Sequence, residues 1–172
     1  MIQQRIIDIA KSFIGMQEIQ GNMGFKNTYF EYLMEETGWQ KNQAWCAYFC
    51  ELVWKITYQE ISPDTISILD KLFAAGAVKT FNNFKESELF MVDKHPEPGA
   101  IVIWQNWKNN LPNWTGHAGI VTSIINDNQF DTIEGNTNSK GGQEGIEVTK
   151  KVRRLNFDAR NGLVLKGFIH AK

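Results

Sequence analysis

The sequence predicts an α+β fold in which N-terminal helices pack on a C-terminal antiparallel β-sheet. As far as Gly76, apolar residues recur at spacings of three and four, the pattern of amphipathic helices. Beyond residue 80, runs of β-branched and aromatic residues bounded by turn residues indicate strands instead. Helices followed by strands are typical of an α+β domain with an antiparallel sheet. A chain of 172 residues, 42% of them hydrophobic, is long enough for one buried core and short for two, so we expect one domain over residues 1–172.

Four helices are predicted, over residues 2–15, 25–38, 46–57 and 67–76. Glycine ends the first, second and fourth of these segments, as it commonly does just after a helix. Cys46 falls in the first turn of the third helix, and Ser67 is a candidate N-cap of the fourth. The predicted apolar face of the second helix consists of Phe25, Tyr29, Tyr32 and Leu33.

Five strands are predicted, over residues 100–104, 117–125, 129–134, 146–155 and 164–169. Pro98-Gly99 introduces the first strand, and Asp127-Asn128 forms the turn of a hairpin between the second and the third. Gly141-Gly142 marks a break before the fourth strand.

The charge balance argues against nucleic acid as a partner. Eighteen basic residues against nineteen acidic ones give a net charge of −1, so no overall field attracts nucleic acid or an anionic membrane. The last stretch, from Lys150 to Lys172, is locally basic. It either favours an acidic polymer or protects an exposed edge strand against pairing with other chains.

The N-terminus has neither the apolar core nor the cleavage site of a signal peptide, and no run of eighteen apolar residues occurs. We therefore expect neither classical secretion nor membrane insertion, and the sequence leaves the location of the protein open.

The two cysteines lie four residues apart on one predicted helix. Their side chains would run in parallel, which does not suit a disulfide, so a reduced compartment or a working thiol fits better. In the first turn of a helix, unpaired backbone N–H groups favour a thiolate, and a neighbouring imidazolium would lower the pKa of Cys46 further. Cys46 is therefore a candidate nucleophile, although a small buried apolar role describes most reduced cysteines. Cys50, one turn further along, is expected to be structural.

His117 is the histidine placed to act as a base. It opens a strand after Gly116, where the missing side chain lets another group approach closely. His117 and Val121 share one face of this strand, so we expect the imidazole to point toward a helix packed on the sheet. His95 and His170 have no comparable setting and are expected to be structural or exposed.

Glu134 ends the strand paired with that of His117, and the short turn between them predicts that the two side chains are neighbours. The carboxylate can accept the Nδ1 proton of His117 and fix the tautomer of the ring. Asn136 would be a further polar anchor. A Glu-Gly-Asn sequence is also common in turns of purely structural value.

The oxyanion of a tetrahedral intermediate needs donors, and the backbone N–H of Cys46 is the natural first one. Gln43, in the loop before it, is a candidate for the second. Trp45, Trp107 and Trp114 either form walls against which a sugar or peptide packs or belong to the core.

With these motifs in this order the chain resembles the CHAP family, the cysteine- and histidine-dependent amidohydrolases and peptidases of bacterial cell-wall turnover and phage lysis. This family is related to the NlpC/P60 and papain-like enzymes. The resemblance covers most of the chain and is carried by five motifs, Ile14–Glu18 with Gly21-Asn22, Trp45–Phe49, Pro98–Trp104, Gly116–Val121 and Glu134–Thr137.

The resemblance implies a papain-like topology and a set of roles. Cys46 would be the nucleophile, His117 the general base and then acid, Glu134 the group that orients it, and Asn136 an auxiliary polar group. Glu18 and Asn22, in the first motif, become candidates for substrate binding.

Two departures from the family limit this transfer. The family often has Pro-Gly-Asp before the central strand, where this chain has Pro98-Gly99-Ala100. The aspartate-rich calcium loop of some phage members is missing, so we expect no metal and no other cofactor. The papain signature around the cysteine is also absent.

The expected function is hydrolysis of a peptidoglycan amide bond by a cysteine nucleophile, in a monomer whose partner is peptidoglycan. The bond is either the sugar-to-alanine amide or one within the stem peptide or cross-bridge. Two alternatives remain, a papain-like amidase acting on a peptide outside the cell wall and a wall-binding module without catalytic activity.

Overall fold

The computed structural model describes residues 1–137 and 145–172. These form helices followed by an antiparallel sheet, as predicted, and the sheet has six strands. The predicted break at Gly141-Gly142 lies outside the described residues. The helices are α1 Ile2–Ser12, α2 Thr28–Glu36, α3 Cys46–Ile61, the short 3₁₀ turn η1 Pro63–Thr65, α4 Ile66–Leu72 and α5 Ala77–Ser87. The strands are β1 Val92–Asp93, β2 Ile101–Lys108, β3 Leu111–Asn126, β4 Gln129–Thr137, β5 Glu147–Arg154 and β6 Gly162–Ile169.

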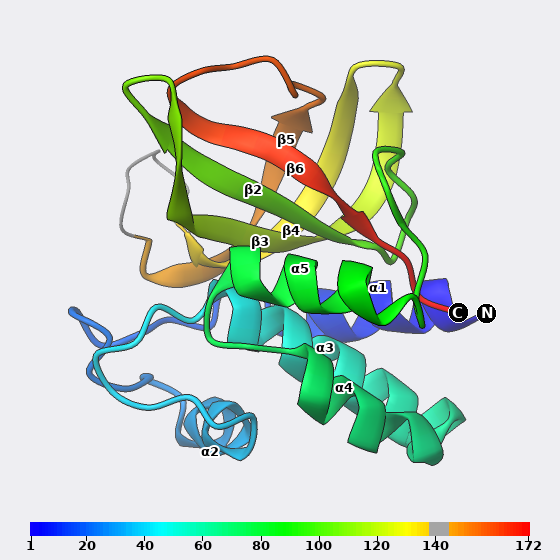
Figure 1. The fold of residues 1–172 in the computed structure, drawn as a ribbon. Coiled ribbons are helices and arrows are strands. Elements are labelled where there is room, and N and C mark those ends of the chain that lie inside the picture. Colours follow the sequence, from blue (N-terminus) through cyan, green and yellow to red (C-terminus); the bar gives the residue numbers. More distant parts are fainter. Residues whose placement is uncertain (138–144) are drawn as a thin grey trace.

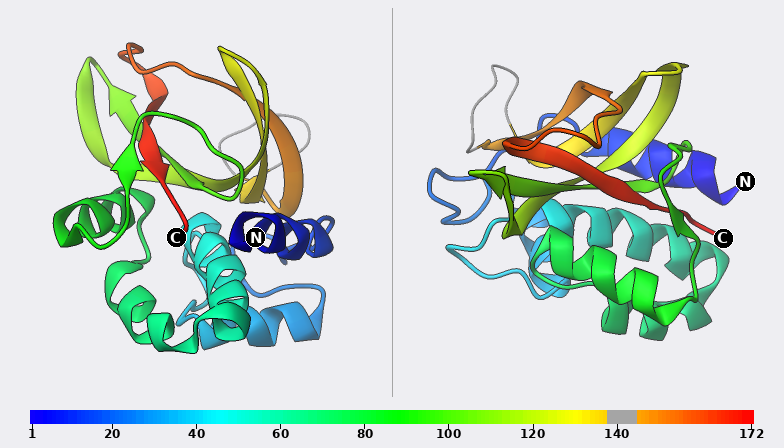
Figure 2. Two further views of the ribbon diagram at one scale, coloured as in Figure 1. Left: turned by 90° about the vertical axis from the view of Figure 1, so that its right-hand side faces the viewer. Right: turned by 45° about the horizontal axis from the view of Figure 1, so that its top comes forward.

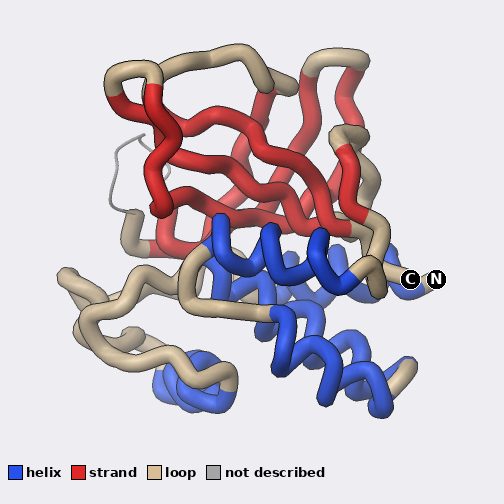
Figure 3. The backbone as a smooth tube through the Cα atoms, viewed as in Figure 1, coloured by secondary structure: helices blue, strands red, loops and turns tan. Residues whose placement is uncertain are grey.

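Two layers make up the structure, with the helices on one side of the sheet (Figure 1; Figure 3). The strand order is β1-β6-β2-β3-β4-β5, and the sheet curls into an open half-barrel (Figure 2). Helix α3 contacts β3 and β4, and α5 contacts β2 and β3. In the part of the chain that the structure describes, no helix combines the length and apolar character needed to cross a membrane.

The curled sheet has a core on each face. Ile101 and Ile103 of β2 pack with the helices, whereas Val102 and Trp104 belong to a second core inside the curl. This alternation follows from the pleat, because successive side chains of a strand point to opposite faces. Side chains inside the curl therefore lie on the face of the sheet opposite the helices, except where the tip of α3 reaches the sheet.

The predicted apolar face of the second helix is only partly correct, since Leu33 packs against the core but the two tyrosines do not. Helix α2 buries Phe30 and Met34, whereas Tyr29 and Tyr32 are 68% and 54% exposed. The helix begins later than predicted, because the Asn27 side chain caps it by accepting from the N–H of Phe30. This later start places Phe25 in the preceding loop.

Two elements were missed, the helix α5 and the short strand β1. The buried residues of α5 include Ala77, Phe81 and Phe84, at helical spacing. The segment also contains Thr80, Asn82 and Asn83, whose low helix propensity hid that spacing. Helix α4 begins at Ile66, with Thr65 at the N-cap position but without a side-chain capping bond, and not after Ser67 as predicted.

A glycine fixes the approach of β4 to the start of α3. A Cβ atom on Gly135 would lie 2.5 Å from the Trp45 ring and 2.8 Å from Cβ of Phe49. Atoms of a side chain cannot approach so closely, so only glycine lets β4 pass over the first turn of α3. This contact sets the distance between the helix that carries Cys46 and the strand that carries Glu134.

The edge strand β5 is also paired with the segment that follows α1. The N–H of Gly15 donates to the carbonyl of Val148 at 2.9 Å, and the N–H of Val148 donates to that of Met16, also at 2.9 Å. The N–H of Glu18 donates to Ile146 at 2.7 Å. The segment after α1 therefore pairs with the start of β5 on the side opposite β4.

Candidate active site

Cys46 is the first residue of α3, as predicted, and follows the N-cap residue Trp45. It is buried, with 6% of its surface exposed. Its sulfur accepts hydrogen bonds from the backbone N–H groups of Ala47 and Ala118. Two peptide dipoles, one from the helix and one from β3, therefore converge on the thiol and favour its anionic form.

The His117 imidazole hydrogen-bonds the Cys46 sulfur, and its Nε2 lies 2.8 Å from Oε2 of Glu134. The three predicted side chains are thus brought together. The prediction that Glu134 contacts Nδ1 is wrong, because the carboxylate is hydrogen-bonded to Nε2 instead. Because Glu134 is ionised, Nε2–H donates to its carboxylate, and Nδ1 is the nitrogen left to face the thiol.

The orientation of His117 on β3 also differs from the prediction. His117 and Val121 share a face, but this face turns into the curl of the sheet, where Val121 lies in the second core. Ala118, on the opposite face, packs with the helices. Cys46 still meets the imidazole because the tip of α3, and not its side, reaches β3 at Ala118.

The charges of these groups stabilise a thiolate–imidazolium pair. Burial raises the pKa of Cys46, but the hydrogen bond and charge of His117 outweigh it, so the pKa falls below that of an ordinary thiol. Burial lowers the pKa of His117, but its contacts with Cys46 and Glu134 raise it to about 10. Both shifts favour the charged forms, the thiolate of Cys46 and the imidazolium of His117. For Cys50, burial raises the pKa well above its usual value, which fits a structural role.

We expect Cys46 to react with iodoacetamide at pH 7 faster than a free thiol. As the pH falls, Cys46 takes up a proton and alkylation slows. As the pH rises through about 10, His117 loses its proton, so alkylation stays fast while any hydrolysis that needs the imidazolium declines. Mass spectrometry of the alkylated protein measures the alkylation rate at each pH. The Cys46→Ala variant serves as the control, because it reports any alkylation of Cys50 alone. A single midpoint near about 8.5, the value of an unperturbed thiol, would contradict the pairing.

Glu134 is fully buried and bonded on both oxygens. Thr132 donates to Oε1 at 2.5 Å, Nε of Arg153 donates to Oε1 at 2.7 Å, and Nη2 of Arg153 donates to Oε2. Burial raises the pKa of Glu134, but Arg153 and then His117 bring it down to about 2. The carboxylate is therefore ionised at any pH at which the protein would work.

Sequence reasoning missed Arg153, Thr132 and Trp104. The indole of Trp104 stacks on the His117 ring, with centroids 5.7 Å apart and planes at 27°. Thr132 stands two residues before Glu134 and so on its face, a signal that alternation in β4 could have given. Arg153 was counted only within the basic C-terminal stretch, because its place beside Glu134 depends on how β5 pairs with β4.

Asn136 is not joined to this group. It has a left-handed backbone, with φ of 53°, at the irregularity in pairing between Glu134 and Thr137. Among residues 1–137 and 145–172, no hydrogen bond links it to Cys46, His117 or Glu134.

Two hydrogen bonds to its side-chain oxygen fix the orientation of Gln43. Oε1 accepts from the hydroxyl of Tyr48 at 3.0 Å and from the N–H of Gln40 at 3.1 Å. Both contacts use the oxygen, so the amide nitrogen of Gln43 is the end that remains for a ligand.

Trp45 is not a wall for substrate. It is fully buried, and its Nε1 donates to Glu18, which is 5% exposed. The other oxygen of Glu18 accepts from the N–H of Asn22 at 3.4 Å. The predictions that Trp45 and Glu18 bind substrate are therefore wrong, since the two side chains bond each other in the interior. The backbone of Asn22 shares in this link and also accepts from the N–H of Asn42 at 2.7 Å.

Trp107 lies near the end of β2 and Trp114 near the start of β3, on either side of the hairpin turn that joins these strands. Trp114 is 81% exposed and stands three residues before His117. Trp107 is partly buried, with the guanidinium of Arg160 5.5 Å from its ring centroid. Both remain candidates for contact with substrate.

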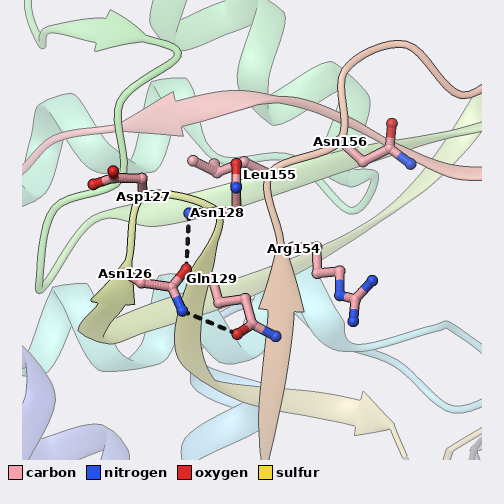
Figure 4. Close-up of a pocket in the computed structure, with 7 residues that line it drawn as sticks. All are labelled: Asn126, Asp127, Asn128, Gln129, Arg154, Leu155 and Asn156. Atoms are coloured by element: carbon pink, nitrogen blue, oxygen red, sulfur yellow. Dashed lines mark hydrogen bonds between the residues drawn. The ribbon is translucent and has the colours of Figure 1, made fainter.

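A cavity of about 690 Å³ opens at the far end of the β3–β4 hairpin (Figure 4). The Asn126 side chain donates to the side-chain oxygen of Gln129 at 3.1 Å and accepts from the backbone N–H of Asn128 at 2.9 Å. None of its lining residues is a candidate nucleophile or base. Among the described residues, no group of three or more His, Cys, Asp or Glu side chains is arranged to hold a metal ion.

Comparison with known proteins gives one match. A family model described as the CHAP domain matches residues 37–136, a segment that contains Cys46, His117 and Glu134. No curated protein and no solved structure matches the chain.

Proposed function

Because this chain belongs to the CHAP domain family, we propose that it is a cysteine-dependent hydrolase that cleaves an amide bond of peptidoglycan. The observation that carries the proposal is the contact of the Cys46 sulfur with an imidazole whose far nitrogen is bonded to a buried carboxylate. A buried core residue needs no such partners. The proposed enzyme is a single catalytic domain over residues 1–172 that acts as a monomer.

In the proposed reaction the Cys46 thiolate attacks the amide carbonyl and forms a tetrahedral intermediate. The N–H of Cys46 and the amide nitrogen of Gln43 are the proposed donors to its oxyanion. Nδ1 of His117 then gives its proton to the leaving nitrogen as the C–N bond breaks. Water attacks the resulting thioester with His117 as base and releases the acid and the free thiol.

Glu134 serves this reaction by holding the imidazole. It keeps Nε2 protonated, so the same nitrogen, Nδ1, faces the reacting atoms in both steps. We place Asn136 outside this machinery as an auxiliary polar group. Trp114, with Trp107 beside it on the hairpin, is the proposed surface for a sugar ring or stem peptide, because an exposed indole offers a large apolar face.

The test is to incubate the protein with purified peptidoglycan and to identify the released fragments by mass spectrometry. We expect new amino and carboxyl termini and no new reducing sugar ends, since an amide and not a glycosidic bond is cut. The termini will also distinguish the sugar-to-alanine amide from a bond within the peptide. New reducing ends, or intact peptidoglycan beside active cleavage of a peptide outside the wall, would refute the proposal.

A further inference from the structure

Four charged groups form a chain across the site, each from a different element. They are the Cys46 thiolate of α3, the His117 imidazolium of β3, the Glu134 carboxylate of β4 and the Arg153 guanidinium of β5. Their signs alternate and their sum is zero. The first three are the machinery of the proposed function, which does not use Arg153.

Arg153 forms a bidentate ion pair with Glu134. Its Nε and Nη2 donate to the two different oxygens of the carboxylate, the two-point geometry that makes arginine–carboxylate pairs strong and specific. Oε2 accepts from both Nη2 of Arg153 and Nε2 of His117. The position of the oxygen that orients the imidazole is therefore fixed by the guanidinium.

Trp104 supports both ends of this arrangement. The guanidinium of Arg153 lies 4.9 Å from the centroid of the indole on which the His117 ring stacks. The Arg153 side chain is 27% exposed, whereas that of Glu134 is fully buried. The cation stands between solvent and a carboxylate that has no direct access to water.

We propose that Arg153 is a positioning residue that keeps Glu134 ionised and in place, and that through Glu134 it sustains the Cys46–His117 ion pair. The inference rests on the proposed function for its meaning in catalysis, but its effect on the thiol is measurable without any substrate. Among the contacts of Glu134, the hydrogen bond from Arg153 does most to offset burial, which raises the pKa of the carboxyl, and to bring that pKa to about 2.

Removing the guanidinium leaves one uncompensated negative charge in a buried site. A buried carboxylate without its cation takes up a proton more readily, and a neutral Glu134 no longer stabilises the imidazolium. Cys46 then holds its own proton to higher pH. Among the described residues, the titratable neighbours are Cys50 of α3, whose thiol interacts with Cys46 and Glu134, and Lys151, which strand alternation places on the same face of β5 as Arg153. Strand β2 contributes the uncharged indole of Trp104.

The experiment compares Arg153→Met with Arg154→Met, a matched control in which the neighbouring, exposed arginine of the same strand is changed. Alkylation of Cys46 by iodoacetamide and cleavage of peptidoglycan are both followed against pH. We expect the acid limb of both profiles to move upward by about one pH unit or more in Arg153→Met, to move less in Arg153→Lys, and to stay in place in Arg154→Met. Circular dichroism checks that each variant is folded.

A second comparison tests whether Arg153 acts through Glu134. In a Glu134→Gln background the carboxylate is gone, so Arg153→Met should change the alkylation rate by less than about twofold. This double variant has no unpaired buried carboxylate. If Arg153→Met does not fold, the double variant and Arg153→Lys still test the role of Arg153.

Two results would overturn the inference. One is a folded Arg153→Met whose alkylation profile superimposes on that of the unchanged protein. The other is an equal effect of Arg153→Met with and without the Glu134 carboxylate. Failure of the proposed function is a separate result, because peptidoglycan would then stay intact with the unchanged protein while the alkylation profiles still decide the role of Arg153.

Discussion

Cys46→Ala is expected to abolish hydrolysis of peptidoglycan, with a fall in rate of about a millionfold or to the limit of detection. The attacking atom is lost, and no other described thiol can replace it, since Cys50 is 1% exposed and burial raises its pKa. The fold should survive because the change removes one sulfur from a small side chain. Release of soluble fragments and the circular dichroism spectrum measure the two effects.

Cys50→Ala is the matched control for this change. It removes the same atom from the same helix one turn further on, in a side chain that is also buried. We expect it to lower stability somewhat and to leave hydrolysis in place. Fragment release that persists in Cys46→Ala, or that is lost only in Cys50→Ala, would remove Cys46 as the nucleophile.

The second large effect is expected for His117→Ala, which should lower kcat/KM by about 10⁴-fold. Without the imidazole, the thiol has no charge partner and the leaving amine has no proton donor. Glu134→Gln should cost less, since the amide oxygen still accepts from Nε2, although the amide nitrogen cannot accept the hydrogen bonds that the other carboxylate oxygen takes from Arg153 and Thr132. Steady-state kinetics of both variants give the order.

The pH profile separates the two roles. Glu134→Gln should keep a working imidazole, but the high-pH fall in activity should then have its midpoint below about 10. The reason is that the carboxylate is one of the contacts that raise the pKa of His117. A larger loss in Glu134→Gln than in His117→Ala would count against the assignment of base and orienting group.

The parts of the structure that local pattern determines were predictable. Cys46 begins its helix because apolar spacing starts there, and His117 meets Glu134 because a short turn folds β3 onto β4. Both conclusions needed only the period of a helix or strand and the chemistry of a turn. The CHAP motifs then ordered the same residues into one site.

The features that sequence reasoning missed depend on contacts between distant segments. The burial of Trp45 follows from its bond to Glu18, 27 positions earlier, and an indole beside a nucleophile gives no local sign of this. The fork of Arg153 on Glu134 spans 19 positions and requires the pairing of β5 with β4. The choice of Nε2 over Nδ1 depends on the rotation of one ring, which no spacing encodes.

The hydrogen bonds of Gly15 and Met16 to Val148 bear on where this protein can be cut. The segment that the family model matches, 37–136, begins after α1 and ends before Arg153. A fragment trimmed to this segment would lose the hydrogen bonds between the residues after α1 and β5. It would also lose the guanidinium that pairs with Glu134. A fusion protein built with this chain should therefore attach its partner outside residues 2–170 and leave that stretch whole.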